Sequence, residues 1–226
     1  MDQSVTITGD ELFHLRNVNR AKPGDEIEVI DGKGSLYYGR LRDIGREVAA
    51  VDIYKQENLP KPPVRVVVAP SLIKKKAMHL MVEKLAEIGV DEIRPVIFTH
   101  TDEKFSPGML KKWQLIAIQS LKVNKRLWAS GIFPPVTLEQ LLSQVGPMAT
   151  NLVLDIAGQP LNGLSLTLPA LAIIGPPGDF IDQERLLLRD KGFFLARIND
   201  CILKTDTAAL SIAAILKTKE VRAIPA

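Results

Sequence analysis

The order of apolar and polar residues divides the chain into two parts. In the first third, short alternating segments predict strands at residues 5–8, 26–30, 35–41 and 47–54. A D-G-K-G turn between the second and third segments is typical of a hairpin. Strands this short and this closely spaced predict a small barrel. The N-L-P-K-P-P segment at 58–63 predicts a linker, because consecutive prolines do not join a central strand.

The rest of the chain alternates apolar runs with helical patterns. A continuous apolar run at 64–70 is typical of a strand buried on both faces, and further strands are expected at 91–98, 151–156, 171–174 and 193–198. Between them lie segments with helical spacing of apolar residues. Strands that alternate with helices predict an α/β fold with a mostly parallel sheet.

Capping residues predict where these helices begin and end. Gly89 is expected to close a helix whose core face carries Met78, Met81, Val82 and Leu85. Ser106 and Pro107 are expected to open a helix that reaches about Leu121, and Thr137 with Gln140 resembles a capping box. Asp182 and Thr205 are expected to cap the last two helices. The final helix is apolar nearly all round, so we expect both sides to be covered, one of them by a second copy of the chain.

Three loops are expected at the carboxyl ends of strands, where open α/β sheets bind ligands. They are L-D-I-A-G, G-P-P-G-D and I-N-D-C-I-L-K-T-D-T. The two prolines of G-P-P-G-D lack amide donors, and Asp179, Asp182 and Asp206 near helix starts would repel an anion. A phosphate-bearing ligand is therefore disfavoured, and a ligand with cationic and apolar parts fits better. The alternative for G-P-P-G-D is a purely structural turn.

Charge distribution and cysteine content indicate what kind of partner the protein binds and in which compartment it works. Residues 64–130 carry 12 Lys and Arg against 6 Asp and Glu, a local net charge of +6 within a chain of net charge +3. Focused positive charge attracts polyanions, although a solvated lysine face is the alternative. The single Cys201 and the absence of a signal sequence or a long apolar run indicate a cytoplasmic protein. Three scattered histidines and one cysteine give no metal-ligand spacing.

Several segments together resemble one protein family. G-P-P-G-D-F-I-D-Q-E and C-I-L-K-T-D-T-A-A-L resemble the paired motifs, roughly G-P-E-G-G-F-S-x-x-E and R-I-L-R-T-E-T-A-A, of the RsmE family. Members of this family are bacterial 16S rRNA uridine-N3 methyltransferases. The segments at 14–27, 81–95 and 113–118 are similar to further family segments, so the resemblance runs from about residue 14 to 214.

The resemblance implies a fold, a cofactor and partners. The fold is a SPOUT-type α/β methyltransferase domain with a trefoil knot at residues 62–226, after a PUA-like RNA-binding barrel at 1–61. The implied cofactor is S-adenosylmethionine, with no metal, and this ligand carries a sulfonium and no phosphate. The implied partners are a second copy of the chain and 16S rRNA in the small ribosomal subunit. The alternative is a ribosome-associated RNA-binding protein of the same fold that has lost catalysis.

The resemblance also assigns residues. The expected cofactor pocket comprises Leu154, Gly175, Pro176, Gly178, Ile198, Ile202, Leu203, Thr205 and Ala208. Arg126 and Lys204 are the candidates for stabilising a uridine anion, and Asp206 either accepts its proton or orients the helix start. The candidate RNA contacts are Arg16, Arg20, Lys22, Lys74, Lys75, Lys76 and Trp128, whereas Trp113 is expected in the core.

The chain departs from the family pattern at several of these positions. Lys204 stands where the family has arginine, and Asp206 where it has glutamate. Pro177 replaces glutamate, and Asp179 replaces glycine. Arg126 alone is retained from the family's E-Q-S-G-R segment. These departures affect the expected target nucleotide more than the expected fold.

Overall fold

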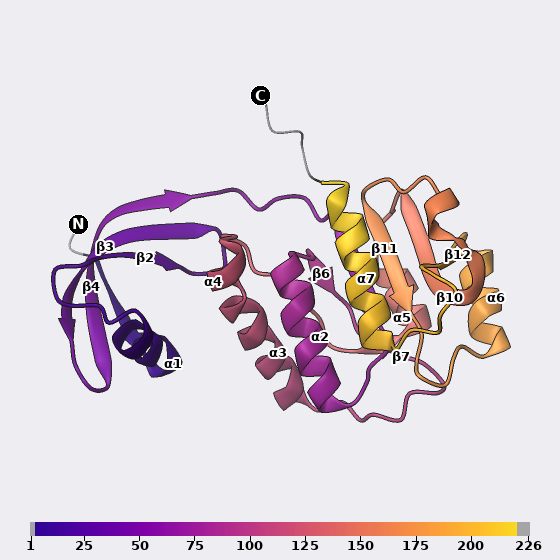
Figure 1. Ribbon diagram of the computed structural model, residues 1–226, viewed down its shortest axis with the longest axis horizontal. Coiled ribbons are helices and arrows are strands. Elements are labelled where there is room, and N and C mark those ends of the chain that lie inside the picture. Colours follow the sequence, from indigo (N-terminus) through magenta and orange to yellow (C-terminus); the bar gives the residue numbers. More distant parts are fainter. Residues whose placement is uncertain (1–2, 221–226) are drawn as a thin grey trace. The chain divides into compact units, whose positions relative to one another are not determined.

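The proline-rich segment after the last N-terminal strand separates two units of the computed structural model (Figure 1). The structure describes residues 3–220. The units are Met1–Pro62 and Pro63–Ala226. The boundary expected from the sequence, between residues 61 and 62, falls in the same segment.

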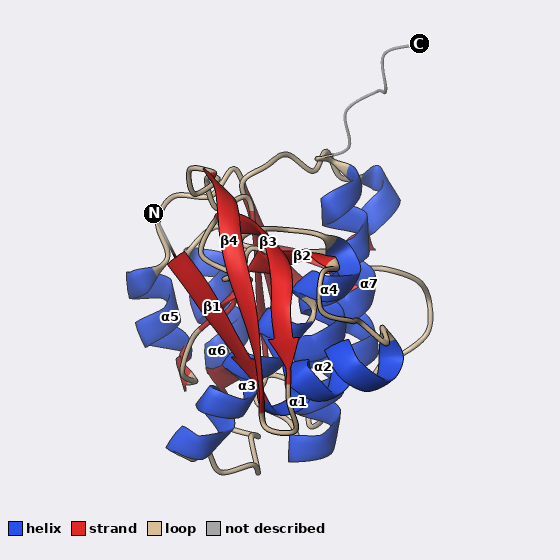
Figure 2. Ribbon diagram, turned by 90° about the vertical axis from the view of Figure 1, so that its left-hand side faces the viewer, coloured by secondary structure: helices blue, strands red, loops and turns tan. Residues whose placement is uncertain are grey.

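The first unit is built on one antiparallel sheet, in the order β1-β4-β3-β2 (Figure 2). Its strands are β1 (Gln3–Thr8), β2 (Glu26–Ile30), β3 (Ser35–Ile44) and β4 (Val48–Asn58). Helix α1 (Gly9–Phe13) continues into the π-helical turn η1 (His14–Val18). Leu12 and Leu15 from these helices pack on Leu41 and Val51 of the sheet, which forms the core of this unit.

The second unit contains a parallel sheet of six strands in the order β12-β10-β11-β5-β6-β8. These strands are β5 (Val66–Pro70), β6 (Glu92–Ile93), β8 (Gly131–Ile132), β10 (Thr150–Pro160), β11 (Ala170–Ile174) and β12 (Phe194–Arg197). The predicted parallel α/β sheet is confirmed, since β10 pairs in parallel with β11 and β12, and β5 with β11 and β6.

The strand expected at 91–98 is wrong as one continuous element. The segment forms β6 and then β7 (Val96–Ile97), which pairs with β9 (Val136–Thr137) in a separate two-stranded sheet. Pro95 lies between the two strands and has no N–H to donate to a ladder. Val96 nevertheless stays beside the end of β5, because its carbonyl accepts the Leu72 N–H at 2.8 Å.

Helices cover both faces of the six-stranded sheet. Those of the second unit are α2 (Lys75–Ile88), α3 (Pro107–Gln119), α4 (Leu121–Asn124), α5 (Leu138–Gln144), α6 (Asp182–Asp190) and α7 (Thr205–Thr218), with a 3₁₀ turn η2 (Leu161–Gly163). Val66 and Val68 pack with residues of α2, α3 and α7, whereas Val67 and Ala69 pack with residues of α5 and α6. Strand β5 is therefore buried on both faces, as its continuous apolar run predicts.

Most helix ends agree with the capping residues. Gly89 is the C-cap of α2 with φ 87°, Ser106 is the N-cap of α3 with proline following, and Thr137 with Gln140 forms the capping box of α5. The helix opened by Ser106 ends at Gln119 rather than Leu121, because a separate turn, α4, follows.

The two expected caps at Asp182 and Thr205 are wrong by one residue. Helix α6 begins at Asp182 after the N-cap Ile181, and α7 begins at Thr205 after the N-cap Lys204. The Glu184 carboxylate, rather than Asp182, accepts the Ile181 N–H at 3.0 Å. No helix among residues 3–220 is long and apolar enough to cross a membrane.

Candidate functional site

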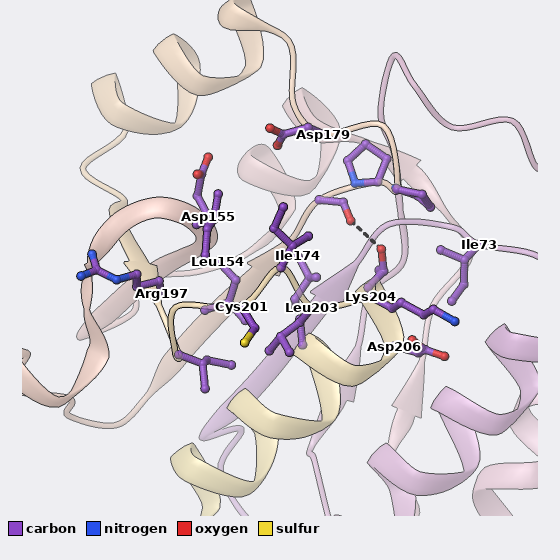
Figure 3. Close-up of a pocket in the computed structure, with 18 of the residues that line it drawn as sticks. Ile73, Leu154, Asp155, Ile174, Asp179, Arg197, Cys201, Leu203, Lys204 and Asp206 are labelled. Atoms are coloured by element: carbon purple, nitrogen blue, oxygen red, sulfur yellow. Dashed lines mark hydrogen bonds between the residues drawn. The ribbon is translucent and has the colours of Figure 1, made fainter.

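A cavity of about 730 Å³ opens at the carboxyl ends of β10, β11 and β12 (Figure 3). Its walls come from the three strand-end loops identified in the sequence, from the start of α7 and from the β5–α2 connection. Apolar side chains that line it include Ile73, Leu154, Ile156, Ile174, Ile198, Ile202 and Leu203, and charged ones are Lys74, Asp155, Asp179, Arg197, Lys204 and Asp206. This volume lies within the usual range, roughly 300–1,000 Å³, of small-molecule sites.

The structure gathers the expected cofactor residues at this cavity. Leu154, Gly175, Pro176, Ile198, Ile202, Leu203, Thr205 and Ala208 all line it. Gly178 is not among the lining residues, although its neighbours Pro177 and Asp179 are. Segments separated by about 130 residues in sequence, from Ile73 to Lys204, thus meet around one cavity because parallel strands end at the same sheet edge.

Thr205 joins the G-P-P-G-D loop to the start of α7. Its Oγ1 donates a hydrogen bond to the Gly175 carbonyl at 3.0 Å (Figure 3, dashed line). The side chain is buried, and a buried hydrogen bond of this kind contributes about 1 kcal/mol. The hydroxyl therefore holds two walls of the cavity together instead of capping its own helix.

The G-P-P-G-D loop is a β-turn followed by a left-handed residue. The Asp179 N–H donates to the Pro176 carbonyl at 3.0 Å, which places Pro177 at the second turn position that proline favours. Asp179 has φ 66°, whereas neither Gly175 nor Gly178 has a positive φ. The residue that needs the left-handed region is thus Asp179, at the position where the resembling family has glycine.

The two glycines of this loop make room for side chains. A Cβ on Gly175 would lie 2.7 Å from the Phe180 ring, and a Cβ on Gly178 would lie 3.2 Å from the Cβ of His100. The His100 Nδ1 lies 3.0 Å from the Gly178 carbonyl oxygen and 2.9 Å from that of Asp179, so this nitrogen carries the proton. Close packing within the protein therefore explains both glycines.

Arg185 of α6 connects two acidic residues of the cavity wall. Its Nε donates to the Asp155 carboxylate at 3.1 Å and its Nη2 to that of Asp179 at 2.6 Å. Burial lowers the pKa of the Arg185 guanidinium, but hydrogen bonds and charges of Asp179 and Asp155 outweigh it and raise the pKa above its ordinary value. The guanidinium is therefore held in its positively charged form.

Two of the three candidate catalytic residues lie at the cavity. Lys204 is exposed, Asp206 is half-buried, and both extend toward the side of Ile73 (Figure 3). The Asp206 Oδ1 accepts the Thr207 N–H at 2.9 Å, which ties this carboxylate to the first turn of α7. One oxygen of Asp206 is thus engaged in orienting the helix start.

Arg126 lies elsewhere. Its Nη2 donates to Asp91 Oδ1 at 3.0 Å, while Asp91 Oδ2 accepts the N–H groups of Arg65 and Val66 at the start of β5. The cavity is at the other end of this strand, roughly 15 Å away for five residues of extended chain. Within one chain Arg126 therefore does not lie beside Lys204, and its catalytic role stays a prediction.

The candidate RNA contacts are divided between the two units. Arg16, Arg20 and Lys22 are exposed on the first unit, and the Arg16 guanidinium also reaches the Gly45 carbonyl at 3.5 Å. On the second unit, Lys75 and Lys76 are exposed in the first turn of α2, next to the cavity residue Lys74. Three residues separate Lys74 from the end of β5 at Pro70.

The two tryptophans differ in burial. Trp128 is half-buried, and Trp113 is fully buried in the core, as its helical spacing predicts. Among residues 3–220, no group of three or more His, Cys, Asp and Glu side chains is placed to hold a metal ion.

Sequence reasoning missed Asp155, Arg197 and Arg185 as individual members of the site. Asp155 comes directly after the apolar residues 152–154 within β10, and Arg197 is the last residue of β12, so their place after apolar residues is the signal that identifies them. Arg185 has no such signal, because its role depends on how α6 packs beside β10. Its charge is typical of any exposed helix position.

Comparison with known proteins identifies the family of this site. A family model for the RNA methyltransferase domain matches residues 60–217, which include every residue of the cavity wall. The chain belongs to this RNA methyltransferase family. A second family model, for the RNA methyltransferase PUA domain, matches residues 7–53 and confirms the expected PUA-like first unit.

Relatives of this RNA methyltransferase cover most of the chain. A ribosomal RNA small subunit methyltransferase E of Synechocystis is 28% identical over 217 residues, which are 92% of this chain and 71% of that protein. The protein of the same name from Aquifex aeolicus is 28% identical over 91% of this chain and 90% of its own.

Solved structures share the fold. A ribosomal RNA small subunit methyltransferase E from Neisseria gonorrhoeae, bound to S-adenosyl methionine, matches with a TM-score of 0.81 and 25% identity over 96% of this chain and 92% of that one. The SpoU methyltransferase AviRb of Streptomyces viridochromogenes matches with a TM-score of 0.50 and 14% identity over 79% and 67%. The SPOUT-type α/β fold is thereby confirmed, and the trefoil knot stays a prediction.

Proposed function

We propose that this RNA methyltransferase transfers a methyl group from S-adenosylmethionine to N3 of a uridine in 16S rRNA of the small ribosomal subunit. The observation that carries the proposal is the cavity at the strand ends. It lies wholly within the matched methyltransferase domain, and eight of the nine residues expected to bind the cofactor line it. The names of the Synechocystis and Aquifex relatives support small-subunit rRNA as the substrate.

The lining residues fit S-adenosylmethionine in size and charge. Leu154, Ile198 and Leu203 offer apolar contacts for an adenine ring, and the backbone near Gly175 offers polar groups for its edges. Acidic and basic side chains line the cavity in equal number, three of each, which suits a ligand such as S-adenosylmethionine that carries both positive and negative groups. The cofactor supplies an electrophilic methyl group on its sulfonium, and the protein supplies binding, orientation and electrostatics.

The residues of this chain would act on the uridine. Methylation at N3 requires that the N3 proton leaves, and the negative charge that develops spreads to the neighbouring oxygens. The Lys204 ammonium at the cavity mouth is the group that would stabilise this charge. The Asp206 oxygen not engaged by Thr207 would orient Lys204 or accept the proton.

The expected partners follow from the same proposal. Lys74, Lys75 and Lys76 would contact RNA phosphates near the cavity, and Arg16, Arg20 and Lys22 would contact RNA from the PUA domain. Trp128 would stack on an RNA base. We expect a homodimer that works in the cytoplasm, where ribosomal subunits are assembled.

A second function remains open because of one observation. Arg126, the only residue retained from the family segment E-Q-S-G-R, is paired with Asp91 away from the cavity. A protein of this fold that binds RNA without turnover is therefore the alternative. Calorimetry with S-adenosylmethionine separates the two, since retained RNA binding without cofactor binding supports the alternative.

Labelled methyl transfer tests the activity itself. Purified protein, small subunits and S-adenosylmethionine with a tritiated methyl group should give label in 16S rRNA. Lys204→Ala should lower kcat about 100-fold, in the range of electrostatic catalytic groups, with little change in cofactor affinity. Equal losses in turnover and affinity would move Lys204 from the substrate side to the cofactor side, and no label with wild-type protein contradicts the proposal.

A further inference from the structure

Arg185 lies behind the cavity and joins two of its walls. The guanidinium makes three hydrogen bonds: to the carboxylate of Asp155 in β10, to the Asp179 carboxylate, and to the Phe180 carbonyl at 2.7 Å. Asp155 and Asp179 line the cavity, and Arg185 is not among the lining residues. One side chain of α6 thus fixes the distance between β10 and the G-P-P-G-D loop.

The Asp155 end of this bridge is buried. The side chain of Asp155 is 2% exposed, and its other oxygen accepts the Ala157 N–H at 2.8 Å. A buried carboxylate needs a charged or hydrogen-bonding partner, and removing one partner of a buried pair costs more than the pair itself contributes. Asp155 therefore holds the Arg185 guanidinium in one position, and the G-P-P-G-D loop binds to that guanidinium through Asp179.

The Asp179 end of the bridge is the adjustable part. Asp179 is in the left-handed region with φ 66°, its Oδ1 accepts the Phe180 N–H at 2.8 Å, and its Oδ2 accepts Arg185. Aspartate is tolerated at positive φ but less readily than glycine. The ion pair and the local hydrogen bond both favour the conformation that turns the loop around the cavity.

We propose that Arg185 is a positioning residue that holds the G-P-P-G-D loop against Asp155 and thereby sets the affinity for the methyl donor. The inference rests on the proposed function and adds to it the residue that pre-forms the pocket. Ordering a loop before a ligand arrives removes that cost from binding. Arg185 touches no cavity space, so its effect on the reaction passes through Asp155 and Asp179.

The first test compares Arg185→Gln with a control on the same helix. Arg189→Gln removes an equally charged side chain that is 72% exposed and lies 4.0 Å from the Asp190 carboxylate. Calorimetry with S-adenosylmethionine should show about tenfold weaker binding for Arg185→Gln and wild-type binding for Arg189→Gln. In methyl transfer, KM for the donor should rise with kcat almost unchanged at saturation, a separation that general unfolding would not produce.

The second test uses Asp179, where two substitutions differ in what they keep. Asp179→Gly removes the ion pair but accepts the left-handed backbone easily. Asp179→Asn keeps the size of the side chain and loses its charge. Both should weaken donor binding several-fold while the protein stays folded, so the inference remains testable even if Arg185→Gln fails to fold.

A double-mutant cycle tests whether Arg185 affects donor binding through Asp179. If Arg185 acts through Asp179, the combination of Arg185→Gln and Asp179→Asn should weaken binding by less than the product of the separate effects. Wild-type affinity in every variant, or fully multiplicative effects, overturns the inference while the proposed function stands. A wild-type protein that binds no S-adenosylmethionine overturns both.

Discussion

Each residue of the G-P-P-G-D loop has its own structural role. Pro177 takes the second position of the turn, Asp179 takes the left-handed position, and Gly175 and Gly178 leave room for Phe180 and His100. Neither glycine has a positive φ, so the space that each one leaves for a neighbouring side chain is the reason the structure gives for its lack of a Cβ.

Gly175→Ala should destabilise the protein by about 1–3 kcal/mol, because the new Cβ would meet the Phe180 ring in a packed core. The contact would be 2.7 Å, shorter than any ordinary van der Waals distance. Urea unfolding measures the loss. Gly146→Ala is the matched control, since nothing lies within 4 Å of the added atom, and equal stability of the two variants would contradict the packing account.

His79 makes stability depend on pH. Burial lowers the pKa of His79, and the positive charges of Lys75 and Lys112 lower it further. The unfolded chain takes up this proton near pH 6.5, whereas the folded chain stays neutral to lower pH, so stability is full above that value. The free energy of unfolding should fall as the pH drops below about 6.5, by at most about 1.4 kcal/mol per pH unit.

Urea unfolding at several pH values from 5 to 8 measures this dependence. His79→Gln should flatten it between the folded pKa and about 6.5. Replacing both Lys75 and Lys112 by glutamine should weaken it, because their charges oppose protonation of the folded chain. An unchanged slope in His79→Gln would assign the dependence to other groups.

At the scale of elements, the junction between the end of β11 and the start of α7 forms the floor of the cavity. Thr205 joins these elements through its hydrogen bond to the Gly175 carbonyl. Thr205→Val keeps the shape of the side chain and removes only the donor. We expect a loss of about 1 kcal/mol in stability and weaker binding of S-adenosylmethionine.

Thr207→Val is the matched control for this junction. Thr207 lies in the same helical turn and is exposed, so its substitution should change stability by less than about 0.5 kcal/mol. Thermal unfolding and calorimetry measure both variants. Equal behaviour of Thr205→Val and Thr207→Val would show that the junction contributes nothing.

Elements with strong local signals were predicted well, and those that depend on tertiary partners were not. The apolar runs of β5, β10, β11 and β12 and the capping box of α5 follow from spacing alone. The division of 91–98 into β6 and β7 depends on pairing with β8 and β9, two strands that lie far along the chain. The position of Arg126 likewise depends on Asp91, which accepts hydrogen bonds from the start of β5 as well.

The site shows the same division. Residues that line the cavity follow strand ends, so sequence position was enough to find most of them. Arg185 reaches the site from the side of α6, and only packing shows it. The role of Lys204 in stabilising a uridine anion is implied only by the family resemblance, since a lone lysine at a helix start indicates no particular function.

At the scale of the whole molecule, a domain that belongs to an RNA methyltransferase family follows a PUA domain in one chain. Positive charge is concentrated at residues 64–130, which include the Lys74–Lys76 cluster beside the cavity. Replacing Lys74, Lys75 and Lys76 by glutamine should weaken RNA binding and reduce the salt dependence of the affinity. Each lost phosphate contact lowers the slope of log K against log salt by roughly 0.7–0.9.

Filter binding at several salt concentrations measures this slope. Glutamine at Lys217 and Lys219, near the other end of α7, serves as the charge-matched control for two of the three lysines. An unchanged slope in the triple variant would mean that the cluster is a solvated face. A reduced slope in the control would mean that the RNA affinity depends on the total positive charge of the protein and not on the position of these lysines.

Nucleoside mass spectrometry of 16S rRNA measures whether the protein methylates N3 of a uridine. Small subunits from cells that lack the protein are compared with the same subunits after incubation with purified protein and S-adenosylmethionine. We expect 3-methyluridine to be absent at the target position before incubation and to approach one residue per 16S rRNA afterwards. Undiminished 3-methyluridine in the deletion strain, or none after incubation, would contradict it.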